Sequence, residues 1–216
     1  MRRSLGALAI LMTQVGCSVV GIRTEETPKY EVLLKDENKE IRQYSPYIVA
    51  TTQVQGPFKD SMSSAFRILA AYIFGENEKS QSISMTAPVV AAPSSEKIQM
   101  TAPVVQTKVA DGWQMSFMMP SKYSMQDLPR PKDPRVKLMP VPAKLFAVLR
   151  YSGTWSEEKN QEKADELLKW LIKNGTYQQV SEPVFAGYDP PWTLPFLRRN
   201  EVMIEVRTHN KTDETK

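Results

Sequence analysis

The sequence has very few of the side chains that most metal and catalytic centres require. Its 216 residues include one cysteine, Cys17, and one histidine, His209. A disulfide within the chain is therefore impossible, and the usual cysteine and histidine ligands of a zinc site are missing. A single histidine also leaves no Ser-His-Asp set to assemble.

The chain lacks a basic stripe as well. Its net charge is +4, and charged residues of both signs make up 24% of it. The densest basic stretch, residues 130–137, is interrupted by prolines and by Asp133. We expect a solvated loop there, and we expect no nucleic-acid partner. With 41% hydrophobic residues and this length, a globular fold with a substantial core is expected.

The N-terminal apolar run, residues 5–12, is too short to cross a bilayer. It follows a short positive region and precedes Cys17, an arrangement that resembles a bacterial lipoprotein signal in which the cysteine is lipidated. We predict a signal segment over residues 1–17, a linker over 18–29, and membrane contact through the lipid anchor only. An ordinary secretory signal or an uncleaved anchor is the alternative. The predicted location is the bacterial cell envelope, facing the periplasm, and Ser18 favours the outer membrane.

The rest of the chain shows two kinds of hydrophobic spacing. Most segments alternate apolar and polar residues, which is the pattern of half-buried strands. Two segments have helical spacing, and we predict helices near residues 60–74 and 156–174. The predicted caps are Asp60 or Ser61 for the first helix and Ser156 for the second, which Gly175 ends.

The two helical segments belong to a duplicated unit. Residues 41–58 align without a gap on residues 138–155, with Gly56 on Gly153 and an aromatic residue two positions after each glycine. The pattern predicts one α+β domain, a pseudo-two-fold duplicated antiparallel sheet or barrel flanked by two helices.

The predicted domain covers residues 30–207. Its repeats are expected at about residues 30–128 and 129–207, joined by proline-rich sequence from Pro129 to Pro142, and residues 208–216 are predicted to be a polar tail.

A six-residue sequence, MTAPVV, occurs at residues 85–90 and again at 100–105. Each copy is extended and β-branched, and its proline places it at a strand end, an edge or a bulge. The two copies are predicted as the arms of a hairpin. Met85 and Met100 would then offer similar, polarizable contacts to a flat apolar ligand, or else fill gaps in the sheet.

Four segments resemble the SOUL haem-binding protein family: the doubled MTAPV, AFRILAAYIFGEN at 65–77, FMMPSKYSMQDLPRPKDPRVKL at 117–138 and GYDPPWTLPFLRRNEVMIEV at 187–206. The resemblance extends from about Tyr30 to Val206. It implies a barrel of antiparallel strands built from two repeats, a fold shared with gyrase-inhibitor-like modules that bind small molecules. It also implies haem, or a related tetrapyrrole, as a reversible, non-covalent cofactor in a shallow apolar site.

The resemblance places the haem site beside the first helix and at the loop before the last strand. A porphyrin has two large apolar faces and two propionates, which apolar side chains and arginines can bind. The matching residues are Met62, Phe66, Leu69, Ala70 and Ile73 on the helix and Trp192, Leu194, Phe196, Arg198 and Arg199 on the loop, and Met85 and Met100 complete the set. The helix residues can also be the core-facing stripe of an amphipathic helix.

Some members of the family have been credited with an axial histidine. Here the only histidine, His209, follows the last predicted strand, so we expect no iron ligation by histidine and predict no metal-ligating residue. A methionine, a tyrosine or no protein ligand at all stays open for the iron.

We therefore predict a binding protein rather than an enzyme: a haem-binding envelope protein that holds or transfers haem. A small-molecule hydrolase or a general ligand-binding module on the same fold is the alternative. An enzyme would need a carboxylate or tyrosine with a shifted pKa in a pocket, for which Glu201 and Tyr72 are candidates. A purely structural envelope protein would have no pocket.

Overall fold

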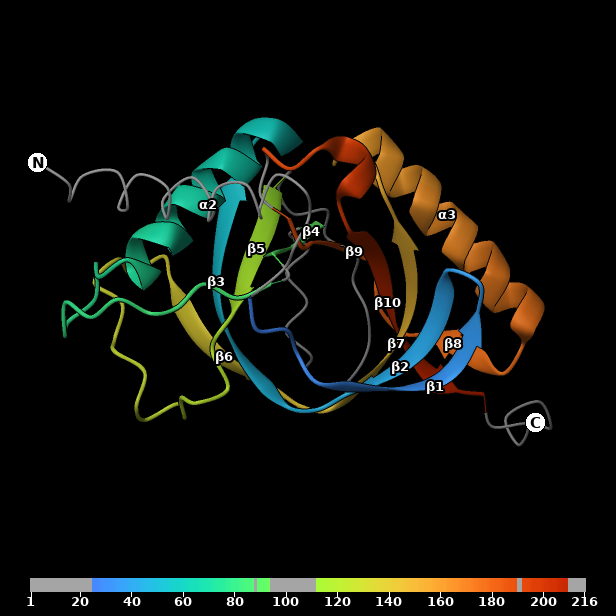
Figure 1. The fold of residues 1–216 in the computed structure, drawn as a ribbon, viewed down its shortest axis with the longest axis horizontal. Coiled ribbons are helices and arrows are strands. Elements are labelled where there is room, and N and C mark those ends of the chain that lie inside the picture. Colours follow the sequence, from blue (N-terminus) through green and yellow to red (C-terminus); the bar gives the residue numbers. More distant parts are fainter. Residues whose placement is uncertain (1–24, 88, 94–111, 190–191, 210–216) are drawn as a thin grey trace, which may run out of the picture.

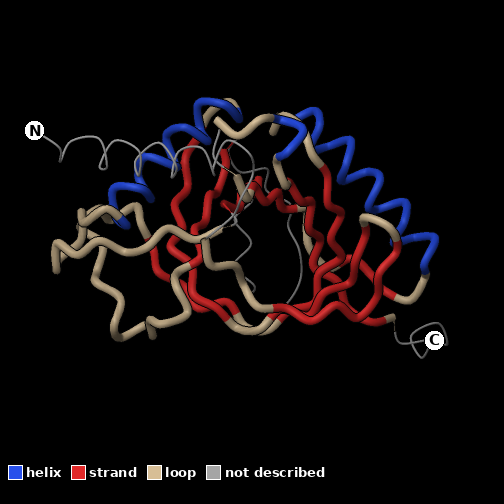
Figure 2. The backbone as a smooth tube through the Cα atoms, in the orientation of Figure 1, coloured by secondary structure: helices blue, strands red, loops and turns tan. Residues whose placement is uncertain are grey.

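The structure is a computed structural model, and it describes residues 25–87, 89–93, 112–189 and 192–209. Figures 1 and 2 show a strongly curved antiparallel sheet with one helix over the outer face of each half. The elements in chain order are β1 (Tyr30–Asp36), β2 (Lys39–Tyr44), β3 (Tyr47–Gln55), α2 (Phe58–Ile73), β4 (Val89–Pro93), β5 (Gly112–Met118), β6 (Lys137–Val141), β7 (Lys144–Tyr151), α3 (Glu157–Asn174), β8 (Tyr177–Gln179), β9 (Val184–Gly187), the 3-10 helix η1 (Pro195–Leu197) and β10 (Asn200–Thr208).

The strand order has the symmetry that the duplication predicts. The sheet runs β1-β2-β7-β10-β9-β4-β5-β3-β6, and β8 pairs with β10 beside this path. Once β1 is set aside, β2-β7-β10-β9 on one side mirrors β6-β3-β5-β4 on the other. The glycines of the aligned turns agree as well, because Gly56 and Gly153 have φ angles of 115° and 116°. The predicted α+β class with two flanking helices is confirmed.

The sheet is open, so the closed barrel that was predicted as one form of this fold is wrong. The first and last strands of the order are β1 and β6. In the described residues each of them pairs with one neighbour, and they do not pair with each other. Both end strands carry features that limit further pairing. Pro140 in β6 has no N–H to donate, and β1 has a bulge between Val32 and Leu34.

The helices begin and end for different reasons. The α2 helix begins at Phe58 after Pro57, so the predicted cap at Asp60 or Ser61 is wrong. A proline suits this position because it has the φ angle of a helix and needs no hydrogen-bond partner. The α3 helix follows the prediction, since the Ser156 side chain accepts from the Lys159 backbone N–H and Gly175 ends the helix with φ 68°.

Each helix buries its apolar stripe against one half of the sheet. The α2 helix packs Leu69 and Ile73 against Met115 and Phe117 of β5. On the other half, α3 packs against β7 and β10, and a third, smaller core lies on the inner face. Trp113 and Trp155 contact both helix cores and so join the two halves.

The first MTAPVV copy enters the centre of the sheet. Thr86 and Ala87 are buried, and Val89 begins β4, which pairs with β5 on one side and β9 on the other. The second copy, with Met100, lies outside the described residues, and so does Cys17. The predicted hairpin of the two copies and the predicted lipid anchor therefore stay predictions.

Candidate functional site

The connection from β9 to β10 is a loop, which we call the site loop (residues 188–199, of which 190–191 are not described). Its base is closed by backbone N–H groups: Tyr188 donates to the Arg199 carbonyl at 3.1 Å, and Arg199 donates to Asp189 Oδ2 at 2.6 Å. Its middle is held by the Gly153 N–H, which donates to the Pro195 carbonyl at 2.8 Å. These bonds hold the described parts of the loop against the rest of the protein.

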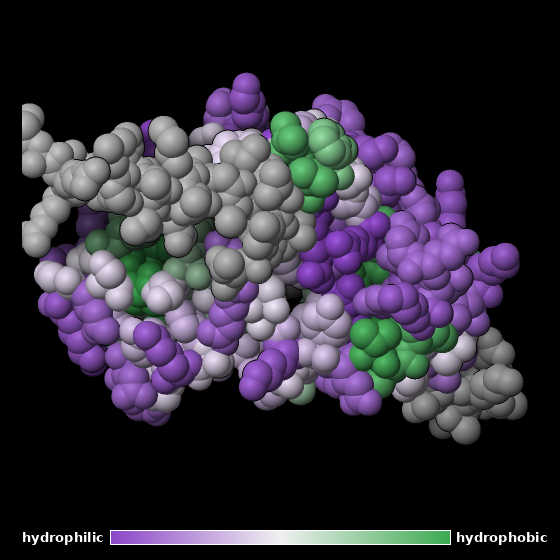
Figure 3. Space-filling view, in the orientation of Figure 1, coloured by the Kyte–Doolittle hydropathy of each residue, from purple (hydrophilic) through white to green (hydrophobic). Residues whose placement is uncertain are grey.

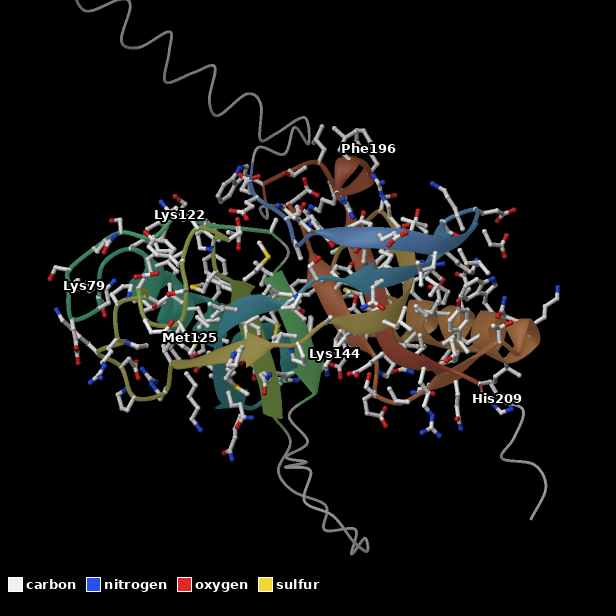
Figure 4. All side chains as sticks on the ribbon, turned by 90° about the horizontal axis from the view of Figure 1, so that it is seen from below. Lys79, Lys122, Met125, Lys144, Phe196 and His209 are labelled. Atoms are coloured by element: carbon white, nitrogen blue, oxygen red, sulfur yellow. The ribbon has the colours of Figure 1, made fainter. Side chains whose placement is uncertain are left out.

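The site loop presents large apolar side chains to solvent. Trp192 is 63% exposed, Leu194 41% and Phe196 69%. An apolar patch lies over this loop in Figure 3, and Figure 4 shows Phe196 at the edge of the molecule. Monomeric proteins seldom expose such a group of residues without a use for it, so the patch is a candidate binding surface.

The first turns of both helices lie beside the site loop (Figure 1). Phe58 at the start of α2 packs edge-to-face against Trp155, which precedes α3, with ring centroids 5.9 Å apart. The positive ends of two helix dipoles are therefore close to the apolar patch. Such ends favour the carboxylate groups of a ligand.

A buried carboxylate anchors the two ends of the site loop. Glu201 on β10 is fully buried, and its oxygens accept from Arg42 Nη1 and Nη2 at 2.9 and 3.1 Å. The same carboxylate accepts from Arg199 Nε and Nη2 at 3.0 and 2.7 Å and from the Tyr188 hydroxyl at 2.7 Å. A buried carboxylate without partners would be strongly destabilising, so these bonds keep Tyr188 and Arg199 in place.

Aromatic rings surround the two arginines of this cluster. The Arg42 guanidinium lies 4.4 Å from the ring centroid of Tyr30 and donates to the Tyr44 hydroxyl at 3.1 Å. The Arg199 guanidinium lies 4.0 Å from the ring centroid of Tyr188. Burial alone would lower the pKa of Arg42 and of Arg199, but the charge of Glu201 raises both above the ordinary value. Both arginines therefore stay charged at every accessible pH.

The predicted site residues of α2 lie mainly in the core. Met62, Leu69, Ala70 and Ile73 are at most 9% exposed and cover the sheet. Phe66 is the exception, at 37% exposed, and its ring packs edge-to-face against Phe117. The alternative interpretation, a core-facing stripe, describes four of these five residues in this structure.

The structure brings the five predicted loop residues together, and it separates them from the only histidine. Met85 is 37% exposed and lies just before the buried Thr86. His209 follows β10, where its backbone N–H donates to the Thr176 carbonyl, and Figure 4 shows it far from Phe196. Within the described residues, no group of three or more His, Cys, Asp or Glu side chains could hold a metal ion.

The two residues considered for catalysis are both engaged. Glu201 accepts from three side chains, as described above. Tyr72 is buried, which raises its pKa to about 12, and its hydroxyl donates to the Pro129 carbonyl at 2.9 Å. Both groups are therefore held by hydrogen bonds within the protein.

Sequence reasoning missed Arg42, Tyr44 and Tyr188 as supports of the site. Tyr30 and Tyr44 also line a shallow hollow of about 390 Å³, whose other lining residues are Lys29, Glu31, Gln43, Ser45, Pro46 and Ala143. The available signal was Glu201 itself, a charged residue in a strand whose neighbours Val202 and Ile204 predict deep burial. A charge at such a position needs a partner, but its identity depends on which strands become neighbours.

Fold and site together define the class of protein: a duplicated α+β protein with an open antiparallel sheet and a loop that exposes apolar side chains. The chain belongs to the SOUL family, because the sequence model described as SOUL heme-binding protein matches residues 25–205. No helix among the described residues is long and apolar enough to span a membrane.

The chain is similar to vertebrate heme-binding proteins. It is 30% identical over 176 residues to Heme-binding protein 2 of Homo sapiens, covering 81% of this chain and 80% of the relative. It is 29% identical over 164 residues to Heme-binding protein 1 of Xenopus tropicalis, covering 76% and 80% of the two chains.

Solved structures with little sequence identity share the fold. The C-terminal domain of EcmrR has a TM-score of 0.57 at 11% identity, with 83% of this chain and 99% of that chain covered. A hydrolase from Listeria innocua has a TM-score of 0.51 at 11% identity, with 81% and 94% covered. At these identities the likeness concerns the fold alone.

Proposed function

We propose that this protein binds haem or a related tetrapyrrole reversibly at the site loop. Family membership supplies the ligand class. The observation that carries the proposal is the set of three exposed apolar side chains, Trp192, Leu194 and Phe196, on a loop that hydrogen bonds hold at its base and middle. Such a surface can cover one face of a porphyrin, and the hydrogen bonds that already hold the loop lower the entropy cost of ordering it.

The two arginines of the site loop are not equivalent as partners of the propionates. Arg199 already gives two donors to Glu201, so a propionate there competes with a buried ion pair. Arg198 Nε donates to the neutral Thr193 carbonyl at 2.8 Å. Exchanging this neutral acceptor for a carboxylate would strengthen the hydrogen bond from Arg198 Nε, which favours Arg198 as a propionate partner.

The helix contributes to this site through Phe66 rather than through its whole apolar stripe. Met62, Leu69 and Ile73 are in the core, and a ligand could reach them only if α2 moved away from the sheet. A surface site without a histidine ligand fits a protein that holds or passes on haem rather than one that keeps it permanently.

The cellular setting is part of the proposal. If Cys17 is lipidated, the folded domain faces the periplasm from a membrane surface, and the 18–29 linker sets its reach. Mass spectrometry of the native protein tests this point. An N-terminus other than lipid-modified Cys17 would remove the anchor from the proposal and leave haem binding untouched.

The direct test is a spectroscopic haemin titration of the protein lacking residues 1–17. We expect saturation at about one haemin per chain with a dissociation constant in the micromolar range or tighter, about 8 kcal/mol. Phe196→Ser should weaken binding about tenfold, because it removes exposed apolar contact area. Arg198→Ala should weaken it less, and the loss should shrink at high salt.

Two variants serve as controls. Phe74→Ser removes a phenylalanine of nearly equal exposure, 67%, at the end of α2, and should leave the affinity unchanged. His209→Ala should leave the Soret band unchanged. A titration that does not saturate, or equal losses for Phe196→Ser and Phe74→Ser, would contradict haem binding at the site loop.

A further inference from the structure

The repeated sequence gives the chain two candidates for one strand of the sheet. The repeat is longer than MTAPVV, because Ile83 precedes the first copy by two positions and Ile98 precedes the second copy by the same distance. Over these eight positions the copies differ only at Ser84 and Gln99. At the seven identical positions, the second copy therefore has the same side chains with which the first copy makes its contacts.

The first copy is bound by contacts that depend on its residue types. Ile83 is 2% exposed in the core under α2, and its N–H donates to the Ile73 carbonyl. The Thr86 hydroxyl donates to the Met118 carbonyl, and Ala87 is 5% exposed in the inner core. The second copy repeats all three residue types, as Ile98, Thr101 and Ala102.

The two valines of the first copy occupy a slot between β5 and β9. Val89 lies opposite Phe117 on one side and Gly187 on the other, and it packs against the core under α2. Val90 points to the opposite face and packs against the inner core. The valines of the second copy, Val104 and Val105, have the same spacing from the same preceding residues.

We propose that this slot is a docking site for either copy, so that residues 104–105 can replace Val89 and Val90 beside β5 and β9. The exchange shortens the connection after the strand by fifteen residues and lengthens the connection before it by the same number. With the first copy docked, residues 94–112 connect Pro93 to Trp113. With the second copy docked, only residues 109–112 connect Lys108 to Trp113.

The sequence around the second copy suits the slot. The short connection ends in Asp111-Gly112, a pair typical of tight turns between antiparallel strands. Lys108 would replace Pro93 at the end of the strand and restores a backbone N–H that proline lacks. The shorter connection after the strand offsets the longer one before it, since closure entropy varies only slowly with length.

The position of the slot makes the exchange consequential. The strand β4 is the place where the two halves of the sheet meet, because it pairs with β5 of the first half and β9 of the second. Exchange therefore alters which residues join the halves while it keeps the pairing of the other strands.

A double-mutant cycle in the full chain tests the proposal. The variants are Val89→Asp, Val104→Asp and both together, with the unfolding equilibrium constant measured by urea titration. We expect about a twofold loss for each single variant, because one of two docked states is removed. The double variant should lose on the order of a hundredfold or more, because a carboxylate must enter the slot in either state.

The matched control replaces Met85 and Met100 with Gln, singly and together. Met85 is partly exposed, so these variants should stay within twofold of the parent. If Val89→Asp or Val104→Asp alone is as damaging as the double variant, one copy is the sole occupant and the proposal is overturned. A double variant as stable as the parent overturns it too, because neither copy would then supply the strand.

A deletion covers the case in which the double variant does not fold. Removing residues 83–97 joins Ser82 to Ile98 and leaves one copy, preceded by the same isoleucine. We expect a cooperatively unfolding protein with an unchanged circular dichroism spectrum. A deletion variant that does not fold shows that the second copy cannot occupy the slot.

Discussion

At the scale of single residues, the site depends on Glu201 more than on any side chain that a ligand would touch. A carboxylate with no solvent exposure is stable there because two guanidinium groups and a hydroxyl share its two oxygens. Two of these partners, Tyr188 and Arg199, are the ends of the site loop. The hydrogen bonds that offset the cost of burying Glu201 are therefore the same bonds that hold the two ends of the site loop.

Removing one partner of Glu201 should loosen the site loop without unfolding the protein. Tyr188→Phe removes the hydroxyl that donates to Glu201, and we expect about 1 kcal/mol of lost stability and a several-fold weaker affinity for haemin. Tyr72→Phe is the control, because it removes one buried hydroxyl bond far from the loop. Equal effects of both variants on haemin affinity would contradict a positioning role for Tyr188.

The buried tyrosines should make the protein sensitive to alkali. Burial and, second, the charge of Glu201 raise the pKa of Tyr44 and of Tyr188 above the unfolded value of about 10. Below pH 10 both states hold the proton, so this contribution to stability is fully present. Above pH 10 the unfolded chain releases the proton first, and stability should fall by about 1.4 kcal/mol per pH unit for each such tyrosine.

Urea titrations between pH 8 and 11.5 measure this slope. In Tyr188→Phe the slope should decrease by the contribution of one tyrosine. A stability that does not change between pH 10 and 11.5 would show that these hydroxyl groups titrate alike in the folded and unfolded states.

At the scale of elements, local patterns predicted the helices and strands well, and they predicted closure poorly. The side chain of Ser156 and the backbone freedom of Gly175 mark the ends of α3, and the alternation of Val202 and Ile204 shows which face of β10 packs against α3. The start of α2 at Pro57 was missed because a proline cap leaves no side-chain signal of the usual kind. Whether the sheet closes depends on β1 and β6, which are far apart in sequence.

The paired glycine turns give a test of the duplication at the scale of elements. Gly56 and Gly153 have φ near 115°, a conformation that side chains rarely adopt, so each change to alanine should cost about 1–2 kcal/mol. Gly187→Ala is the control, because its φ is ordinary and the added methyl group would meet Trp155 at a normal 3.9 Å. Thermal unfolding measures all three, and a cost at one turn but not at the other would argue against equivalent roles.

At the scale of the whole molecule, the site could be predicted only in part. The exposed residues of the site loop were predicted from the sequence, because Trp192, Leu194 and Phe196 lie in a segment that resembles the SOUL family. The cluster beneath them does not follow, since Arg42 and Glu201 are separated by most of the chain and meet across β7. For the helix residues the sequence left two interpretations open, ligand contact and core, because one apolar stripe serves either purpose until the partner of the helix is known.

The two sequence repeats exchange strands, and this should make each repeat dependent on the other. The first repeat supplies β2, which pairs with β7 of the second repeat, while the second repeat supplies β6, which pairs with β3 of the first. Trp113 and Trp155 contact the cores of both halves.

A fragment of residues 25–135 therefore lacks partners on both sides of its sheet, and we expect it to show no cooperative unfolding by circular dichroism. Mixing it with a fragment of residues 136–209 should restore a cooperative transition, since the missing strand partners are then present. A first fragment that unfolds cooperatively by itself would mean that the duplicated units remain separate folding domains, and that the exchanged strands only fasten two finished halves.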